Sequence, residues 1–194
     1  MGKEIILKQM LEIGVDKLES YLADITLRKV CICFVCVYII MAIIRKWQKK
    51  DGIHQMSNKY MIVCTFYFTC IAVITILGRT DGTVTNSWDK VFLTYESIIE
   101  GKRWVWWEVI FNIILFLPAG MLVTNQFKVD VAFKSVFFIS FLIEVIQLLT
   151  GVGLFEICDL IDNTLGGLVG IILYQLGERL LRIFSSYRKD ERKI

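Results

Sequence analysis

Long apolar blocks without charged residues limit the folds that this sequence can adopt. The clearest block covers residues 60–78 and holds no Asp, Glu, Lys or Arg. A helix of about 20 apolar residues crosses a bilayer core about 30 Å thick. The alternating pattern of membrane strands is absent, and only helices and closed barrels satisfy their backbone inside lipid. We therefore expect membrane-spanning helices.

Five segments fit this requirement, and together they predict an all-α fold. They are residues 30–44, 60–78, 109–125, 131–150 and 160–177. The first is short, but flanking basic residues lengthen it by placing their charges at the interface. We expect an integral membrane bundle of about five transmembrane helices, with an N-terminal amphipathic helix and an outer interfacial helix. This divides the chain into an amphipathic segment 1–29, a transmembrane domain 30–177 and a basic cytoplasmic tail 178–194.

The composition excludes several other classes of protein. Of the 194 residues, 56% are apolar and 21% are charged, unlike a disordered chain or a small disulfide scaffold. The net charge of +3 gives no signal for nucleic-acid binding. We therefore expect membrane lipids as partners and no nucleic acid, and the sequence leaves the oligomeric state open.

Lysine and arginine indicate the orientation in the cell membrane. Residues 45–59, 126–134 and 178–194 would share one side and carry five, two and six of the 22 basic residues. Because cytoplasmic loops are enriched in such residues, we expect this side and the C-terminus to be cytoplasmic. Loop 79–108 would then lie outside, with an interfacial helix whose apolar face includes Trp88, Val91, Phe92, Tyr95, Ile98 and Ile99. Anchoring at the interface is the favoured role of this helix, and a rim guiding lipid head groups is the alternative.

Polar residues inside the spans form the most informative pattern. Ser140, Glu144 and Gln147 share one face of the fourth span, since they are spaced by four and three residues. Asp159 and Asn163 share a face of the fifth span. Asp162 lies beside that face, and Asn112 lies near the start of the third span. Given the expected orientation, all of these groups fall at one level near the outer side.

A carboxylate inside a span is costly, at about 2.5–3.5 kcal/mol on insertion scales, and is a candidate functional group. We assign Glu144 a role as general acid or proton carrier, with Asp159 as its ionised partner. The expected binding residues are Asn112, Ser140, Gln147, Asp162 and Asn163. The alternative is that these groups serve as hydrogen-bonding contacts between helices.

Small residues predict close helix packing. Gly166 and Gly170 form a small-xxx-small stripe on the face of Asn163, which we expect to pack against the fourth span. Pro118 is expected to kink the third span, and Gly120 to ease a close approach. No zinc signature or Ser-His-Asp pattern accompanies the single histidine, His54, so we expect no metal and no cofactor.

Two blocks of the sequence resemble the VanZ-like family of bacterial membrane proteins. The first reads N-x-x-x-F-x-P-x-G from Asn112 to Gly120, and the second runs from Ser140 to Gly170. The resemblance covers roughly residues 109–174. It implies a role in the bacterial cell envelope and an association with resistance to teicoplanin-type glycopeptides, with no established biochemical activity.

The resulting leading hypothesis is a protein that lowers susceptibility to such antibiotics through an outward-facing polar site. Its ligand would be a lipid-linked cell-wall precursor or a glycopeptide. The alternatives are a membrane-embedded acid/base enzyme acting on a lipid-linked envelope precursor, a small transporter or flippase, and a structural scaffold.

Overall fold

The structure is a computed structural model, and it describes residues 12, 15, 26–50, 55–78 and 92–191. Throughout these residues the regular elements are helices. They are α2 (Leu27–Lys50), α3 (Asn58–Ala72), the π-helical turn η1 (Val73–Leu77), α4 (Leu93–Ile99), the 3-10 turn η3 (Arg103–Val105), α5 (Trp106–Gln126), α6 (Val129–Thr150) and α7 (Ile157–Glu191). The expected all-α fold is thus confirmed.

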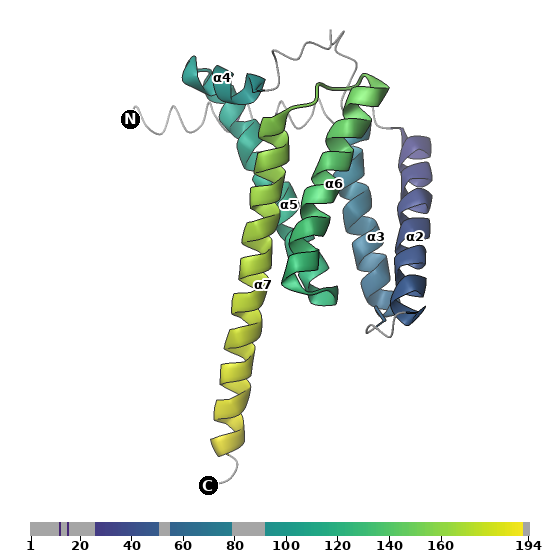
Figure 1. Cartoon of the computed structure of the whole chain (residues 1–194), viewed down its shortest axis with the longest axis vertical. Coiled ribbons are helices and arrows are strands. Elements are labelled where there is room, and N and C mark those ends of the chain that lie inside the picture. Colours follow the sequence, from purple (N-terminus) through teal and green to yellow (C-terminus); the bar gives the residue numbers. More distant parts are fainter. Residues whose placement is uncertain (1–11, 13–14, 16–25, 51–54, 79–91, 192–194) are drawn as a thin grey trace.

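The long helices run side by side, and short α4 lies at one end of the bundle (Figure 1). Four helical segments are long and apolar enough to cross a membrane: Leu27–Lys50, Asn58–Leu77, Trp106–Gln126 and Ile157–Ser186. The chain is therefore a multi-pass membrane protein. The remaining predicted span coincides with α6, which carries Asp130, Lys134 and Glu144 and packs against α5, α7 and η1. The expected number of five is accordingly approximate.

Some sequence-based expectations fall outside the described residues. Most of the amphipathic segment 1–29 belongs to this part of the chain, as do His54, Trp88 and Val91. Within the described part, α4 buries Thr94 and Ser97, whereas Ile99 and the preceding residue Phe92 are exposed.

Helices α5 and α7 make the most extensive contact in the bundle. A Cβ atom on Gly166 would lie 2.3 Å from the Ile113 carbonyl oxygen, and one on Gly170 would lie 1.9 Å from that of Leu117. The glycine stripe therefore packs most closely against α5. The expectation that it faces the fourth span was wrong. The short connection between the fourth and fifth spans favoured α6 as the neighbour, but the glycine face fits against the backbone of α5.

The third span contributes its own glycine to this contact. A Cβ atom on Gly120 would lie 2.0 Å from the carbonyl oxygen of Gly167. Both helices therefore use glycine where their backbones meet. Helix α5 continues through Pro118 to Gln126. Its other side is tied to α3, where the hydroxyls of Tyr60 and Tyr67 donate to the carbonyl oxygens of Leu122 and Leu115.

Helix α7 is longer than the fifth span predicted from the sequence. It continues past Gly177 to Glu191 and projects beyond the other helices (Figure 1). One glycine costs a helix only about 1 kcal/mol, and the Leu, Glu and Arg residues that follow favour helix. The end of the apolar stretch therefore does not end the helix.

We expect Gly170→Ala to destabilise the protein by about 1–3 kcal/mol, because the methyl group would overlap the backbone of α5. Gly177→Ala, on the same helix, is the matched control, since a Cβ there meets nothing within 4 Å. Thermal unfolding in detergent measures both. Equal midpoints for the two variants would contradict the proposed backbone contact.

Candidate functional site

Polar side chains from α6 and the start of α7 are buried at the end of the bundle where α4 lies. The buried residues, each at most 4% exposed, are Ser140, Glu144, Gln147, Asp159, Asp162 and Asn163. Asn112 on α5 is half-buried beside them. The structure thus brings all seven candidate binding or catalytic residues to one end of the bundle, while the packing residues lie along the α5–α7 contact.

Two carboxylates lie at the N-terminus of α7. The backbone N–H of Glu156 donates to Oε2 of Glu144 at 2.9 Å, and Asp159 lies in the first turn of the helix. Asn112 donates through Nδ2 to Oδ1 of Asp159 at 2.9 Å. The positive end of a helix dipole stabilises negative charge. Both acidic groups therefore lie where the fold can hold an anion.

Amide side chains connect α6 to its neighbours on either side. Asn163 donates to the hydroxyl of Ser140 at 3.1 Å, joining α7 to α6. Gln147 donates to the backbone carbonyl of Thr75 at 2.7 Å, joining α6 to η1. Thr75 lies in the last turn before Gly78, where helix carbonyls lack partners in their own helix. These contacts fix the helices around the acidic groups.

Helix α4 adds two contacts that the sequence did not predict. The Tyr95 hydroxyl donates to Oδ1 of Asp162, and that of Thr94 donates to Oε2 of Glu156, both at 2.8 Å. Burial, and then the bond to Asp162, raises the pKa of Tyr95 well above its usual range, so this phenol stays protonated as a donor. Helix α4 is therefore bonded to the site through side chains.

Sequence patterns carry only partial signals for these additional residues. The sequence pattern predicts that Tyr95 belongs to the apolar face of an interfacial helix. Its pairing with Asp162 spans 67 positions in the chain, so no local spacing reveals it. The partner of Gln147 is a backbone carbonyl, which every residue possesses and which no pattern distinguishes.

Three buried oxygen atoms of the site lack a hydrogen-bond donor within the described part of the chain. They are Oδ2 of Asp162, Oε1 of Gln147 and Oδ1 of Asn163. Each can only accept, so the site is rich in acceptors. Groups that donate hydrogen bonds, such as hydroxyl, amide N–H or ammonium, match it chemically. Among the described residues, no group of His, Cys, Asp or Glu is arranged to hold a metal ion.

Comparison with known proteins identifies one family and one relative. The model of the family described as VanZ/LLP1 matches residues 30–181. "Protein VanZ" of Enterococcus faecium is 37% identical over 76 residues, which cover 37% of this chain and 47% of that protein. The match thus spans about half the length of this relative. No solved structure matches the chain.

We expect Asn112→Leu to lower the free energy of unfolding by about 1–3 kcal/mol, because buried Asp159 would lose a hydrogen-bond donor. Asn125→Leu, on the same helix, removes the exposed bond to Tyr174 and should cost less. Unfolding in detergent, followed by circular dichroism, compares the two. A larger loss for Asn125→Leu would be inconsistent with this geometry.

Proposed function

The chain belongs to the VanZ/LLP1 family, and on that premise we propose that it lowers the susceptibility of bacterial cells to teicoplanin-type glycopeptide antibiotics. It would act in the cell envelope, through the polar site at the end of the bundle that carries α4. The resemblance of two sequence blocks to the VanZ-like family motivates the class of antibiotic, and the buried polar site supplies the candidate location.

The single observation that carries this proposal is the burial of carboxylates and amides from α6 and α7 beside Asn112 of α5. Burying polar groups in a membrane protein costs free energy, and such groups commonly mark functional sites. Hydrogen bonds between helices account for several of these groups. They do not account for the acceptor oxygens of Asp162, Gln147 and Asn163 that lack a donor within the described residues.

The chemistry of the site favours a ligand rich in hydrogen-bond donors. Sugar hydroxyls and amide N–H groups have this character, and glycopeptides and lipid-linked cell-wall precursors both offer them. A bound ligand would donate hydrogen bonds to the buried acceptors of Asp162 and Asn163. Without such donors, burying these oxygen atoms costs free energy. The exposed apolar residues Ile99 of α4 and Phe92, which directly precedes this helix, would rest at the interface above the site.

An acid/base enzyme acting on a lipid-linked precursor is the second candidate. It is favoured by the position of Glu144 and Asp159 at one helix N-terminus in different surroundings. Glu144 accepts from a backbone N–H, whereas Asp159 accepts from an amide side chain. Two carboxylates with unlike partners suit unlike roles in proton transfer.

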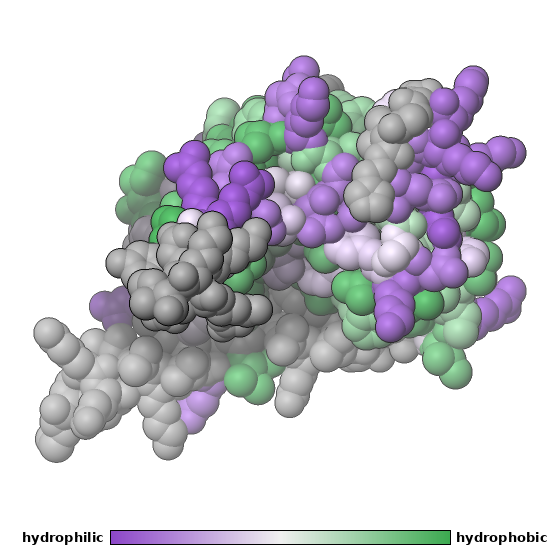
Figure 2. Space-filling view, turned by 90° about the horizontal axis from the view of Figure 1, so that it is seen from below, coloured by the Kyte–Doolittle hydropathy of each residue, from purple (hydrophilic) through white to green (hydrophobic). Residues whose placement is uncertain are grey.

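We propose that the site faces away from the cytosol. The opposite end of the bundle carries most of the basic residues of the described chain, including the ends of α2 and α7. Figure 2 looks onto that end and shows hydrophilic residues around the face, with apolar residues between them. Under the positive-inside rule this end is cytoplasmic, and so is the C-terminus.

We expect Glu144→Gln to return teicoplanin susceptibility to that of cells carrying an empty vector, because the variant keeps the shape of the side chain and removes the carboxyl group. Glu100→Gln is the matched control, since Glu100 is exposed and pairs with Lys102 at the same end. Growth inhibition is measured at equal membrane levels of each protein. Unchanged protection by Glu144→Gln would contradict the assignment of the polar site as the functional site.

Reporter fusions test the orientation. Green fluorescent protein fused to the C-terminus should fluoresce, and alkaline phosphatase fused there should be inactive, because the former folds in the cytosol and the latter outside it. Alkaline phosphatase inserted between α6 and α7, after Gly151, should be active. The reverse pattern would place the polar site at the cytoplasmic face.

A further inference from the structure

A second, chemically different feature lies on the other side of the bundle. Helix α2 packs on α3 and η1, whereas α6 packs on α5, α7 and η1. Between α2 and α6, over α3, the structure contains a cavity of about 460 Å³. This is within the range of about 300–1,000 Å³ found for small-molecule sites. The cavity is not part of the polar site, whose hydrogen-bonded groups lie toward α4 and α7.

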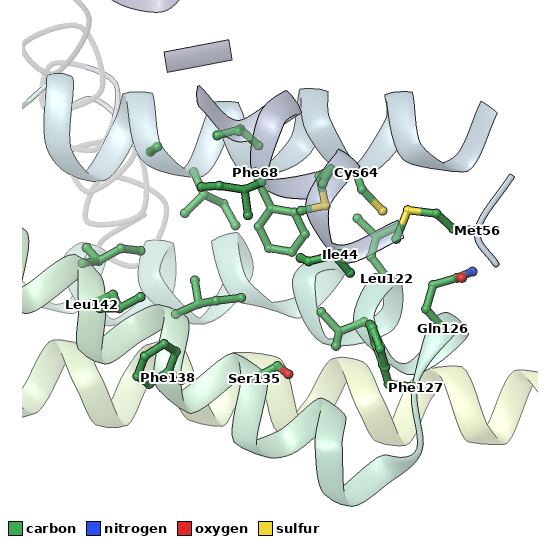
Figure 3. Close-up of a pocket in the computed structure, with 18 of the residues that line it drawn as sticks. Ile44, Met56, Cys64, Phe68, Leu122, Gln126, Phe127, Ser135, Phe138 and Leu142 are labelled. Carbon is green, nitrogen blue, oxygen red and sulfur yellow. The ribbon is translucent and has the colours of Figure 1, made fainter. Parts of the chain in front are cut away.

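The cavity is lined almost entirely by apolar side chains (Figure 3). It extends along the bundle from Tyr60 near the start of α3 to Ile76 in η1, which is about 24 Å at 1.5 Å per residue. Phe68, Phe138 and Leu142 line it between these ends. A long apolar groove within the spans of a membrane protein suits an acyl chain, since it offers almost nothing that a polar solute could bind.

The groove ends among basic residues and unpaired donors. Ile44, Tyr60 and Phe127 line this end and are the sequence neighbours of Arg45, Lys59 and Lys128, respectively. Other basic residues near the same end are Lys46, Lys49, Lys50 and Lys134, with Asp130 as an acidic residue among them. Positive charge at the mouth of an apolar groove matches a negatively charged head group.

Two buried nitrogen atoms at this end point to the same ligand. Gln48 is fully buried, and its side chain accepts from the backbone N–H of Met56, a lining residue, at 3.2 Å. Its Nε2 lacks an acceptor in the described chain, as does Nε of Arg45, whose Nη1 donates to Asn58. Two donors without acceptors beside the groove fit the oxygen atoms of a phosphate.

We propose that this groove binds one anionic phospholipid, with an acyl chain between α2 and α6 and its phosphate at Arg45 and Gln48. The lipid would come from the leaflet at the basic end. This site is independent of the polar site beneath α4, so an experiment can overturn one of the two proposals without affecting the other.

Native mass spectrometry of the full-length protein in detergent tests the proposal with defined lipids. Phosphatidylglycerol should bind more tightly than phosphatidylcholine with the same acyl chains. Glycerol 3-phosphate, which lacks acyl chains, should not displace it. Arg45→Gln should weaken phosphatidylglycerol binding about fivefold, whereas Lys29→Gln, an exposed residue near the opposite end of the same helix, should leave it unchanged. Ala72→Phe, which fills the groove, should weaken both lipids.

Equal affinity for the two lipids would overturn the proposal, as would equal effects of Arg45→Gln and Lys29→Gln. Displacement by glycerol 3-phosphate would indicate a site for free phosphate instead of a lipid. Arg45→Gln leaves the groove lining in place, so it decides the question even if Ala72→Phe does not fold.

Discussion

The close backbone contact between α5 and α7 is the constraint on which the polar site depends. Gly120, Gly166 and Gly170 let the two helices approach so closely that a Cβ atom at any of them would overlap the partner's backbone. Lipid gives helices little hydrophobic reason to associate, so close packing of this kind takes that role. It also places Asn112 within hydrogen-bonding distance of Asp159. The glycine contact and the polar contact thus belong to one helix pair.

Helix α6 packs against both α5 and α7 and completes the site. Ser140 accepts from Asn163, and Glu144 accepts from the backbone at the start of α7. One face of α6 therefore contacts α7 through two polar groups, while Gln147 reaches η1. Removing water from such groups is tolerated only where partners replace it, so these bonds and the helix arrangement stabilise each other.

The sequence predicted the fold class and the approximate position of each long helix, because uncharged blocks and spacing are local properties. The spacing of Ser140, Glu144 and Gln147 likewise predicted a shared face. It could not predict that the glycine stripe packs against α5, that α7 runs on to Glu191, or that Tyr95 bonds to Asp162. The glycine contact and the bond between Tyr95 and Asp162 depend on which helices meet in three dimensions, and local spacing carries no information about that. The extension of α7 instead follows from the helix propensity of the residues after Gly177, which the search for apolar spans does not consider.

The two ends of the bundle differ in chemistry, and this difference bears on function more than any single residue does. At the end with α4, buried oxygen atoms of Asp162 and Asn163 lack donors within the described residues. At the opposite end, buried nitrogen atoms of Arg45 and Gln48 lack acceptors there. A membrane presents different head groups and solutes on its two sides. A protein whose unpaired buried groups differ between its two ends is suited to recognise a different group on each side, and the apolar helices between them keep the two sites separate.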